Sequence, residues 1–147
     1  MRDLPELPQR GRLYLATGIP YRKALKDYFN QEGNAKVWTL DYGYRAGDLI
    51  LTAIQTSPRM FIALEVALTG GAEGTSIQVD GDRSVEFNNG ILADAVAKRA
   101  GIDRFDFQHY YKGSDARRIW KALDEEYRLN KPWFTPERWT DLQDGRE

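Results

Sequence analysis

Two apolar segments near the middle of the chain constrain its fold more than any other feature. Residues 49–54, LILTAI, form a nearly continuous apolar run that is typical of a central β-strand. Residues 60–68, MFIALEVAL, follow after a short connection and place alternate side chains on two faces. The two segments predict strands, and therefore a fold built around a β-sheet.

Further segments also have strand patterns. Residues 12–16 alternate polar and apolar side chains, and residues 37–40, VWTL, form the next stretch before a turn-rich segment. Asp80-Gly81 stands between the short runs 77–79 and 85–87, which predicts a β-hairpin. The pattern alternates again over residues 104–110, which would place three rings on one face, those of Phe105, Phe107 and His109.

Helical patterns lie between and after the predicted strands. Pro20 suits the first turn of a helix that stops near Gly33. A short helix is expected over residues 91–96, ending near Gly101, and a longer helix begins at a cap formed by Ser114. About six strands with helices between them predict an α+β domain with a curved mixed sheet or a small barrel. The longer helix has an apolar stripe that consists of Ala116, Ile119, Trp120, Leu123 and Tyr127.

The composition limits the chemistry that the chain can perform. Its 147 residues suit one domain, with a core over about residues 12–129 and an aromatic-rich tail over residues 130–147. Zero cysteines and a single histidine argue against disulfides, thiol chemistry and histidine-rich metal sites, and we expect no cofactor. No apolar run is long enough to span a membrane, and the N-terminal residues lack a signal-peptide core. We therefore expect a cytoplasmic protein with no membrane partner, and the sequence leaves its oligomeric state open.

Charge is balanced over the whole chain but not along it. The sequence has 21 basic and 22 acidic residues, which gives a formal net charge of −1. Residues 1–68 carry nine basic and seven acidic side chains, whereas residues 69–111 carry four and seven. The near-neutral total argues against a general nucleic-acid coat protein, because non-specific affinity rises with the number of cationic phosphate contacts. A local basic patch remains compatible with it.

The order of these segments is similar to that of a known family. A strand that ends in Thr17-Gly18-Ile19-Pro20 leads into a helix, and a Trp-containing segment precedes residues 44–51, YRAGDLIL. This Gly-Asp entry into an apolar strand resembles that of EVE domains and their ASCH and YTH relatives, which have the PUA-like fold. Residues 60–68 resemble the next strand of the family, and the segment from Phe105 to the Gly-Ser loop resembles its closing strand. The resemblance covers about residues 12–129.

This resemblance implies a reader module that binds nucleic acid, with DNA favoured over RNA. In the family a concave pocket over the sheet holds a nucleobase, often a modified one, that is flipped out or unpaired. Stacking of the base on aromatic rings contributes about 1–3 kcal/mol. Such modules are fused to nuclease domains in modification-dependent restriction, so a nuclease domain is an implied partner, in the same chain or in another.

The candidate base-binding residues lie at the end of the first strand, around the Gly-Asp turn and in the last predicted strand. Trp38 is the strongest candidate for a pocket wall, because the family has an early Trp in that role. Backbone N–H groups at a strand-to-helix junction can also contact a base edge or a phosphate. The alternative is that the aromatic residues are core residues and that His109 is structural. The full set is Thr17, Gly18, Ile19, Trp38, Tyr42, Tyr44, Phe107 and His109.

Basic residues form a second candidate set, because phosphate contacts orient a protein on nucleic acid. The alternative for this set is a solvated helix face. Asp48, in the Gly-Asp motif, is expected to cap a turn and not to contact a ligand. The candidate phosphate-binding residues are Arg22, Lys23, Lys26, Lys36, Arg45 and Lys112.

Two other classes of function stay open. Some ASCH relatives are amidohydrolases that use Lys, Thr and Glu, and Lys23, Thr17 and Glu65 are the residues to consider for those roles. The family's Gly-x-Lys-x-x-Thr spacing is absent, and a glutamate in an apolar strand is more simply a surface or ion-paired residue, so a non-catalytic module is favoured. The other class is a protein-interaction module of a phage or defence system, with a contact surface in the tail around Trp133, Phe134 and Trp139.

Overall fold

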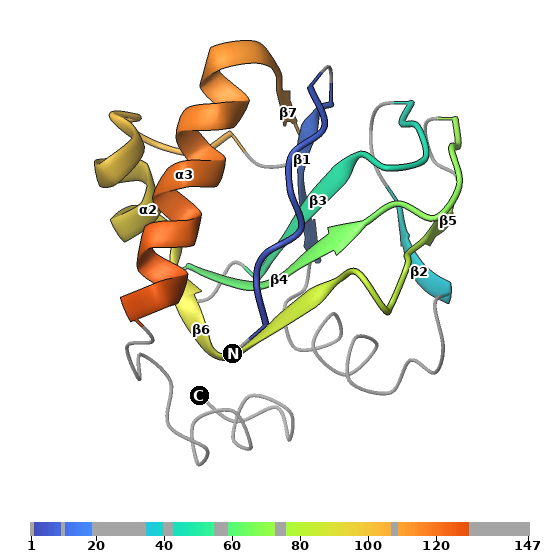
Figure 1. The fold of residues 1–147 in the computed structure, drawn as a ribbon, viewed down its shortest axis with the longest axis horizontal. Helices are drawn as coiled ribbons and strands as arrows, with labels where there is room; N and C mark the ends of the chain where they lie inside the picture. The colour runs from blue at the N-terminus through green and yellow to red at the C-terminus, as the bar shows by residue number, and fades with distance from the viewer. Residues whose placement is uncertain are drawn as a thin grey trace.

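A computed structural model describes residues 2–9, 11–18, 35–39, 43–54, 59–72, 76–106 and 109–129 of the chain. Its strands are β1 (Leu13–Gly18), β2 (Ala35–Thr39), β3 (Leu49–Ile54), β4 (Met60–Val66), β5 (Ser76–Gln78), β6 (Val85–Leu92) and β7 (Tyr110–Tyr111). Its helices are α2 (Ala93–Ala100) and α3 (Gly113–Leu129). The two helices lie together on one side of the strands (Figure 1).

The main sheet has five strands in the order β6-β4-β3-β1-β7. β1 runs parallel to β3, with Leu13 opposite Leu49 and Gly18 opposite Ile54. The other pairings within this sheet are antiparallel. Because parallel neighbours begin at the same edge of a sheet, the residues that precede β1 lie beside those that precede β3.

A second, two-stranded sheet of β2 and β5 lies on the side of the main sheet away from the helices (Figure 1). Two isolated bridges extend the pairing toward it. Ala67, just after β4, bridges to Val79, and Tyr44, before β3, bridges to Gly71. The residues before β3 and those after β4 are therefore held by backbone pairing at the edge of the main sheet where β3 begins.

The hydrophobic core lies between the main sheet and the helices. Leu13, Leu15, Leu49 and Leu51 are fully buried, and β4 is buried along its whole length. These side chains pack in one cluster with the inner faces of α2 and α3. The apolar stripe expected on α3 is confirmed, with three members buried and two packed at the edge of the cluster: Ala116, Ile119, Leu123, Trp120 and Tyr127.

The opposite face of the main sheet carries a smaller cluster. Because side chains alternate along a strand, the residues of β1 and β3 between the leucines point to this face. They pack against the chain before β3, after β4 and around β5. The buried members are Tyr14, Ala16, Tyr44, Ile50, Ala67, Ile77 and Val79.

The N-terminal segment is fastened to α3. Leu4 is buried in the main hydrophobic cluster. The indole Nε1 of Trp120 donates a hydrogen bond to the carbonyl oxygen of Pro5 at 2.8 Å, and the Tyr127 hydroxyl donates to the carbonyl oxygen of Arg2. The segment before β1 is therefore part of the folded unit.

The β-hairpin predicted at Asp80-Gly81 is wrong, although a turn does form there. β5 pairs with β2 and β6 pairs with β4, so the two runs do not pair with each other. The first run reaches the residues after β4 through the bridge of Val79 to Ala67, and the second run pairs with β4 itself. A long buried strand offers each run more contacts than the two short runs could offer each other. Ser84 connects the turn between β5 and β6 to β4. Its hydroxyl accepts a hydrogen bond from the N–H of Val66 at 3.0 Å and donates one to the Asp80 carbonyl oxygen at 2.7 Å.

Three predicted boundaries also differ from the structure. Residues 91 and 92 end β6, and α2 begins at Ala93 and closes at Gly101, whose φ is 73°. α3 begins at Gly113 and not after a Ser114 cap. Residues 104–106 and 109 lie outside the strands, because only Tyr110 and Tyr111 form β7; the carbonyl oxygen of His109 still accepts a hydrogen bond of 2.9 Å from the N–H of Leu15 in β1. The alternation there reflects packing, in which the Phe105 ring is buried against the Phe61 ring.

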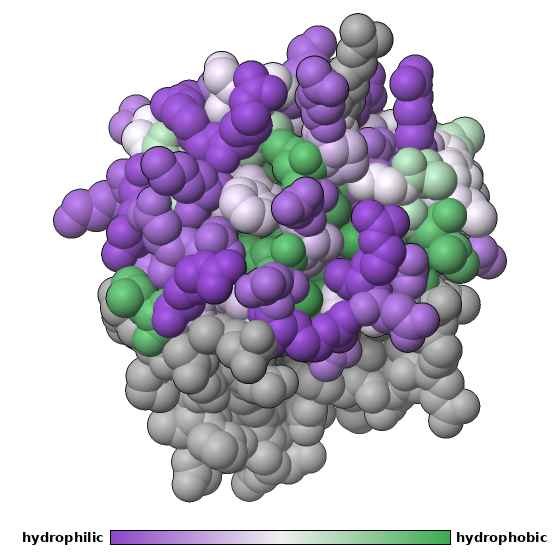
Figure 2. Space-filling view, in the orientation of Figure 1, coloured by the Kyte–Doolittle hydropathy of each residue, from purple (hydrophilic) through white to green (hydrophobic). Residues whose placement is uncertain are grey.

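The predicted α+β class is confirmed, and the main sheet of the described residues is open and not closed into a barrel. The predicted helix that ends near Gly33 and the tail over residues 130–147 lie outside the described residues. Within the described part of the chain, no helix is long and apolar enough to cross a membrane. Figure 2 shows a face on which hydrophilic side chains predominate and hydrophobic ones form small patches.

Candidate functional site

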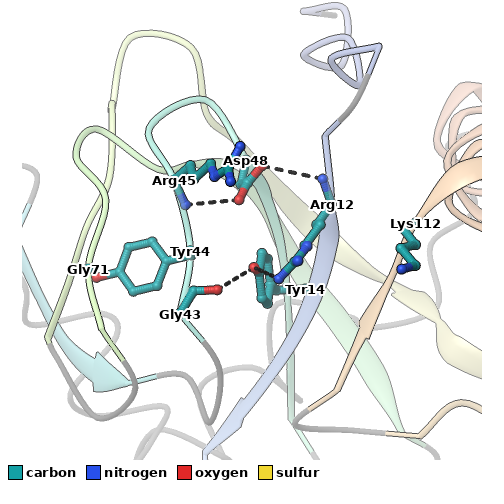
Figure 3. A pocket seen from close by; sticks show the side chains of 8 residues that line it. All are labelled: Arg12, Tyr14, Gly43, Tyr44, Arg45, Asp48, Gly71 and Lys112. Carbon is teal, nitrogen blue, oxygen red and sulfur yellow. Dashed lines mark hydrogen bonds between the residues drawn. The ribbon is translucent and has the colours of Figure 1, made fainter.

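A pocket of about 460 Å³ lies at the edge of the main sheet where β1 and β3 begin. It is on the face away from the helices, because its two tyrosines belong to the smaller hydrophobic cluster. Its walls come from β1, from the turn before β3, from the chain after β4 and from the residue after β7 (Figure 3). The lining residues are Arg12, Tyr14, Gly43, Tyr44, Arg45, Asp48, Gly71 and Lys112.

Asp48 holds the turn that forms one wall of the pocket. Its carboxylate accepts from the backbone N–H of Arg45 at 2.9 Å and from that of Arg12 at 3.3 Å. Gly47, with a φ of 90°, supplies the left-handed residue that the turn requires. The prediction that Asp48 caps a turn is confirmed, and its buried carboxylate also joins the starts of β1 and β3.

Tyr14 forms the floor of the pocket. Its ring is 1% exposed, and its hydroxyl donates to the carbonyl oxygen of Gly43 at 2.5 Å. The same hydroxyl accepts from Nη1 of Arg12 at 3.3 Å (Figure 3). Burial raises the pKa of Tyr14, so the phenol stays neutral and keeps its proton for Gly43.

The guanidinium of Arg12 is held in place from two sides. Its central carbon lies 4.4 Å from the centre of the Tyr110 ring, and one of its N–H groups contacts Tyr14. A cation over an aromatic face is attracted by the ring quadrupole, and a planar guanidinium loses less freedom on binding when it is already oriented. The hydrogen bond with Tyr14 is the main cause that raises the pKa of Arg12, so this residue is a fixed positive charge.

Tyr44 and Gly71 close the side of the pocket opposite Arg12. Their backbones exchange hydrogen bonds of 2.9 and 3.0 Å, and the Tyr44 ring lies over Gly71. A Cβ atom at Gly71 would be 2.6 Å from the Tyr44 hydroxyl, so any other residue at this position would force the Tyr44 ring to move. The Tyr44 ring meets the Tyr14 ring edge to face at 6.5 Å, and burial raises its pKa.

The charges on the pocket lining favour an anion. Arg12, Arg45 and Lys112 are cationic, and Asp48 is the single carboxylate among the described lining residues. The Asp48 carboxylate already accepts two backbone N–H groups, whereas the Arg45 and Lys112 side chains are exposed and can turn toward a ligand. No cluster of three or more metal-ligating side chains was found in the described part of the chain.

The structure brings together three of the residues singled out in the sequence. Tyr44, Arg45 and Lys112 come from distant positions and all line the pocket. His109 is half-buried, with its ring stacked on the Tyr110 ring at 5.2 Å. This placement agrees with a packing role for His109 and does not put it in the pocket lining.

The other candidates are not among the described lining residues of this pocket. Thr17 and Gly18 form the far end of β1, opposite Ala53 and Ile54 of β3. The backbone of Lys36 and Trp38 lies in β2, which contacts β1, but the positions of their side chains are outside the description. Candidates that lie wholly outside the described residues are Ile19, Arg22, Lys23, Lys26, Tyr42 and Phe107.

Arg12 and Tyr14 are the two described lining residues with functional side chains that sequence reasoning missed, besides the glycines Gly43 and Gly71. The signal was present, because residues 12–16 alternate and therefore place Arg12 and Tyr14 on the same face of a strand. An arginine beside a tyrosine on one strand face indicates an anion site only when a second cationic residue from another element lies beside it. That partner, Lys112, follows a strand that pairs with β1 from far along the chain.

Of the two roles expected for Glu65, a surface residue or an ion-paired one, the first is wrong and the second stays a prediction. Its side chain is 6% exposed, and its Oε1 accepts a hydrogen bond of 2.7 Å from the hydroxyl of Thr52, which is 1% exposed. Both residues are on the central strands β3 and β4, at positions that face away from the helices. The correction follows from the topology, because that face is covered in the centre of the sheet.

Compared with known proteins, the chain matches no family model, and no curated protein or solved structure is significantly similar to it. The function is therefore argued from the chemistry of the pocket.

Proposed function

We propose that this protein binds nucleic acid and holds a phosphate group of the bound strand in the pocket at the start of β1 and β3. The observation that carries the proposal is the meeting of Arg12, Arg45 and Lys112 from three separate elements around one concave site. Cationic side chains supply most phosphate contacts in protein–nucleic acid complexes, and those contacts orient the protein on the strand. The nearly neutral net charge of −1 favours one localised contact over a broad basic surface.

The proposal includes a reader role for the neighbouring aromatic residues. β2 carries Trp38 and contacts β1, whose far end is formed by Thr17 and Gly18. A base that leaves the helix stack or belongs to a single strand would bind there by stacking, in the manner of PUA-like EVE modules. The open sheet with helices on one face is compatible with such a fold. A modified base, DNA over RNA, a nuclease partner and a cytoplasmic location belong to the same proposal.

Binding of short labelled oligonucleotides, followed by fluorescence anisotropy, tests the phosphate contact. We expect Lys112→Ala to weaken binding by about three- to tenfold for every sequence and to reduce the salt-dependence slope by about one ion. Arg12→Ala should have a larger effect because its guanidinium is already oriented. Lys121→Ala, on the exposed side of α3, is the matched control and should bind like the wild type. Unchanged binding by both pocket variants would refute the proposal.

Oligonucleotides that carry modified cytosine or adenine test the reader role separately. The wild-type protein should prefer one modification in duplex or single-stranded form, and Trp38→Ala should remove that preference. A base that stacks on an aromatic ring gains about 1–3 kcal/mol, so the loss should be easily measured. A protein that binds strands through Lys112 but shows no preference among bases would be a phosphate-contact protein without a reader function.

The buried contact between Thr52 and Glu65 favours a second candidate, a small hydrolase that acts on a modified nucleoside. A buried carboxylate in the middle of a sheet is costly to hold, and such groups are concentrated at functional sites. In this role Glu65 would move a proton while water cleaves an amide bond of the substrate. Turnover of acylated nucleosides by the wild type and its loss in Glu65→Gln, with an unchanged melting temperature, would support this candidate. No turnover by the wild type would eliminate it.

A further inference from the structure

We infer that the pocket at the start of β1 and β3 binds a terminal phosphate monoester, such as the phosphorylated end of a strand, in preference to an internal phosphodiester. The inference rests on the proposed function, because it assigns a chemical class to the group held in that same pocket. The inference goes beyond the proposed function, because a site for a monoester binds the end of a nucleic-acid strand and not an internal position.

The first argument is the charge of the site. The described lining residues include three cationic side chains, those of Arg12, Arg45 and Lys112. They include one carboxylate, that of Asp48, so the lining has two positive charges in excess. The Asp48 carboxylate is buried and is bound to two backbone N–H groups, so it is part of the turn and not a group that a ligand displaces. A phosphodiester carries one negative charge, whereas a phosphate monoester carries about 1.5 to 2 at neutral pH. The monoester is the better match to the excess charge.

The second argument is the geometry of Arg12. The guanidinium has five N–H donors, and the contact with Tyr14 uses one of them. The Tyr110 ring, 4.4 Å from the guanidinium carbon, fixes the plane of this fork. A planar fork binds two oxygens of one phosphate at once, and a monoester offers three terminal oxygens to Arg12, Arg45 and Lys112 where a diester offers two.

The third argument is the shape of the site. Its volume of about 460 Å³ falls in the range of small-ligand pockets. Its floor is closed by the buried ring of Tyr14, and its side opposite Arg12 is closed by the ring of Tyr44, which is packed against Gly71. In Figure 3 Arg12 and Arg45 lie above the rings of Tyr14 and Tyr44, and Lys112 lies farther off, across β1 from Tyr14. A concave site with a closed floor suits a terminal group better than a continuous strand.

The experiment compares oligonucleotides of one sequence that end in a 5′-phosphate, a 3′-phosphate or hydroxyl groups alone, with adenosine monophosphate as a free competitor. We expect at least about tenfold tighter binding for one of the phosphorylated ends, as charge-assisted contacts to an additional negative charge require. Lys112→Ala and Arg12→Ala should reduce this ratio toward one. Lys121→Ala should keep the ratio. Because Lys112 is exposed, its variant tests the site even if Arg12→Ala proves unstable.

The outcomes separate this inference from the proposed function. Equal binding of phosphorylated and hydroxyl-ended strands, with equal losses in Lys112→Ala, would overturn the inference and leave nucleic-acid binding intact. Binding of adenosine monophosphate through Lys112, together with no binding of any oligonucleotide, would support a monoester site and overturn nucleic-acid binding. If neither oligonucleotide nor mononucleotide binds, both are refuted.

Discussion

At the scale of single residues, the pocket depends on a buried tyrosine at its floor, Tyr14. Tyr14 contacts the turn through the Gly43 carbonyl oxygen and contacts the cationic side through Arg12. Its ring contacts two other tyrosine rings, that of Tyr44 edge to face at 6.5 Å and that of Tyr110 in a tilted arrangement at 5.6 Å. One hydroxyl thus determines both the position of the wall and the orientation of the guanidinium.

Tyr14→Phe should therefore separate the contribution of this hydroxyl from that of the ring. The phenylalanine ring keeps the packing, and the loss of the hydrogen bond to Gly43 should lower the free energy of unfolding by about 0.5–1.5 kcal/mol. Ligand affinity should fall several-fold even under conditions where the variant is fully folded, because Arg12 loses one of its two contacts. Urea unfolding and anisotropy measure the two effects. A stable variant with unchanged affinity would show that Tyr110 alone orients Arg12.

Gly71 and Gly43 offer a matched pair of substitutions on the same pocket. A Cβ atom at Gly71 would lie 2.6 Å from the Tyr44 hydroxyl oxygen and 2.8 Å from its Cζ atom, whereas one at Gly43 would have 3.6 Å to its nearest neighbour. Gly71→Ala should lower the free energy of unfolding by about 1–3 kcal/mol, as overpacking does, and Gly43→Ala should be nearly neutral. Thermal unfolding checks both variants. Equal effects would contradict the close approach of the Tyr44 ring.

At the scale of elements, the N-terminal segment behaves as an additional packing element without regular secondary structure. Leu4 contributes to the main cluster, and hydrogen bonds from Trp120 and Tyr127 of α3 hold the segment on both sides of it. The chain thereby reaches the start of β1 in a fixed position. Because Arg12 stands at that start, the segment also supports the pocket from a distance.

Leu4→Ala tests this support. The loss of a buried leucine side chain should lower the free energy of unfolding by about 2–3 kcal/mol, near the lower end of core substitutions because the segment can settle onto α3. Leu129→Ala, at a position that is 50% exposed, is the control and should change stability by less than about 0.5 kcal/mol. Urea unfolding compares them. Similar effects at the two positions would mean that the segment is not part of the folded unit.

Sequence reasoning predicted the elements whose patterns are local and long. β3 and the apolar stripe of α3 agree with their patterns, and the turn at Asp48 follows from the Gly-Asp pair. The pairing of β5 and β6 could not be predicted in this way, because Asp80-Gly81 is a good local hairpin signal and the competing partner, β4, is distant in sequence. The pocket was half predicted for the same reason. Lys112 meets Arg12 only through the pairing of β7 with β1.

At the scale of the whole molecule, the described residues form two hydrophobic clusters on the two faces of one sheet. The cluster under the helices is aliphatic for the most part, whereas the smaller one contains two tyrosines that keep their hydroxyl groups at the pocket. The stability of the domain is therefore coupled to the ionisation of tyrosines at alkaline pH.

This coupling predicts a loss of stability at alkaline pH. Burial raises the pKa of Tyr14, Tyr44 and Tyr127 above the ordinary value of about 10. Above that value the unfolded chain binds fewer protons than the folded one, so the stabilisation present below about pH 10 is lost as the pH rises through the folded-state pKa values. Urea unfolding from about pH 8 to pH 11 should show a weaker decline in the free energy of unfolding for Tyr44→Phe than for the wild type. The reason is that this variant lacks the phenol whose pKa is raised by burial. A decline identical to that of the wild type would contradict this role for Tyr44.

The parallel pairing of β1 with β3 has a consequence for how such a domain can change. Two strands that run in the same direction deliver the residues before them to the same edge, whatever those residues are. The pocket is lined mostly by such residues, together with others from the chain after β4 and after β7, while the strands themselves carry the core. New ligand preferences can therefore arise by replacing Arg12, Arg45 or Lys112 with little effect on the sheet. The direction of the chain keeps a binding site in place even when its chemistry is exchanged.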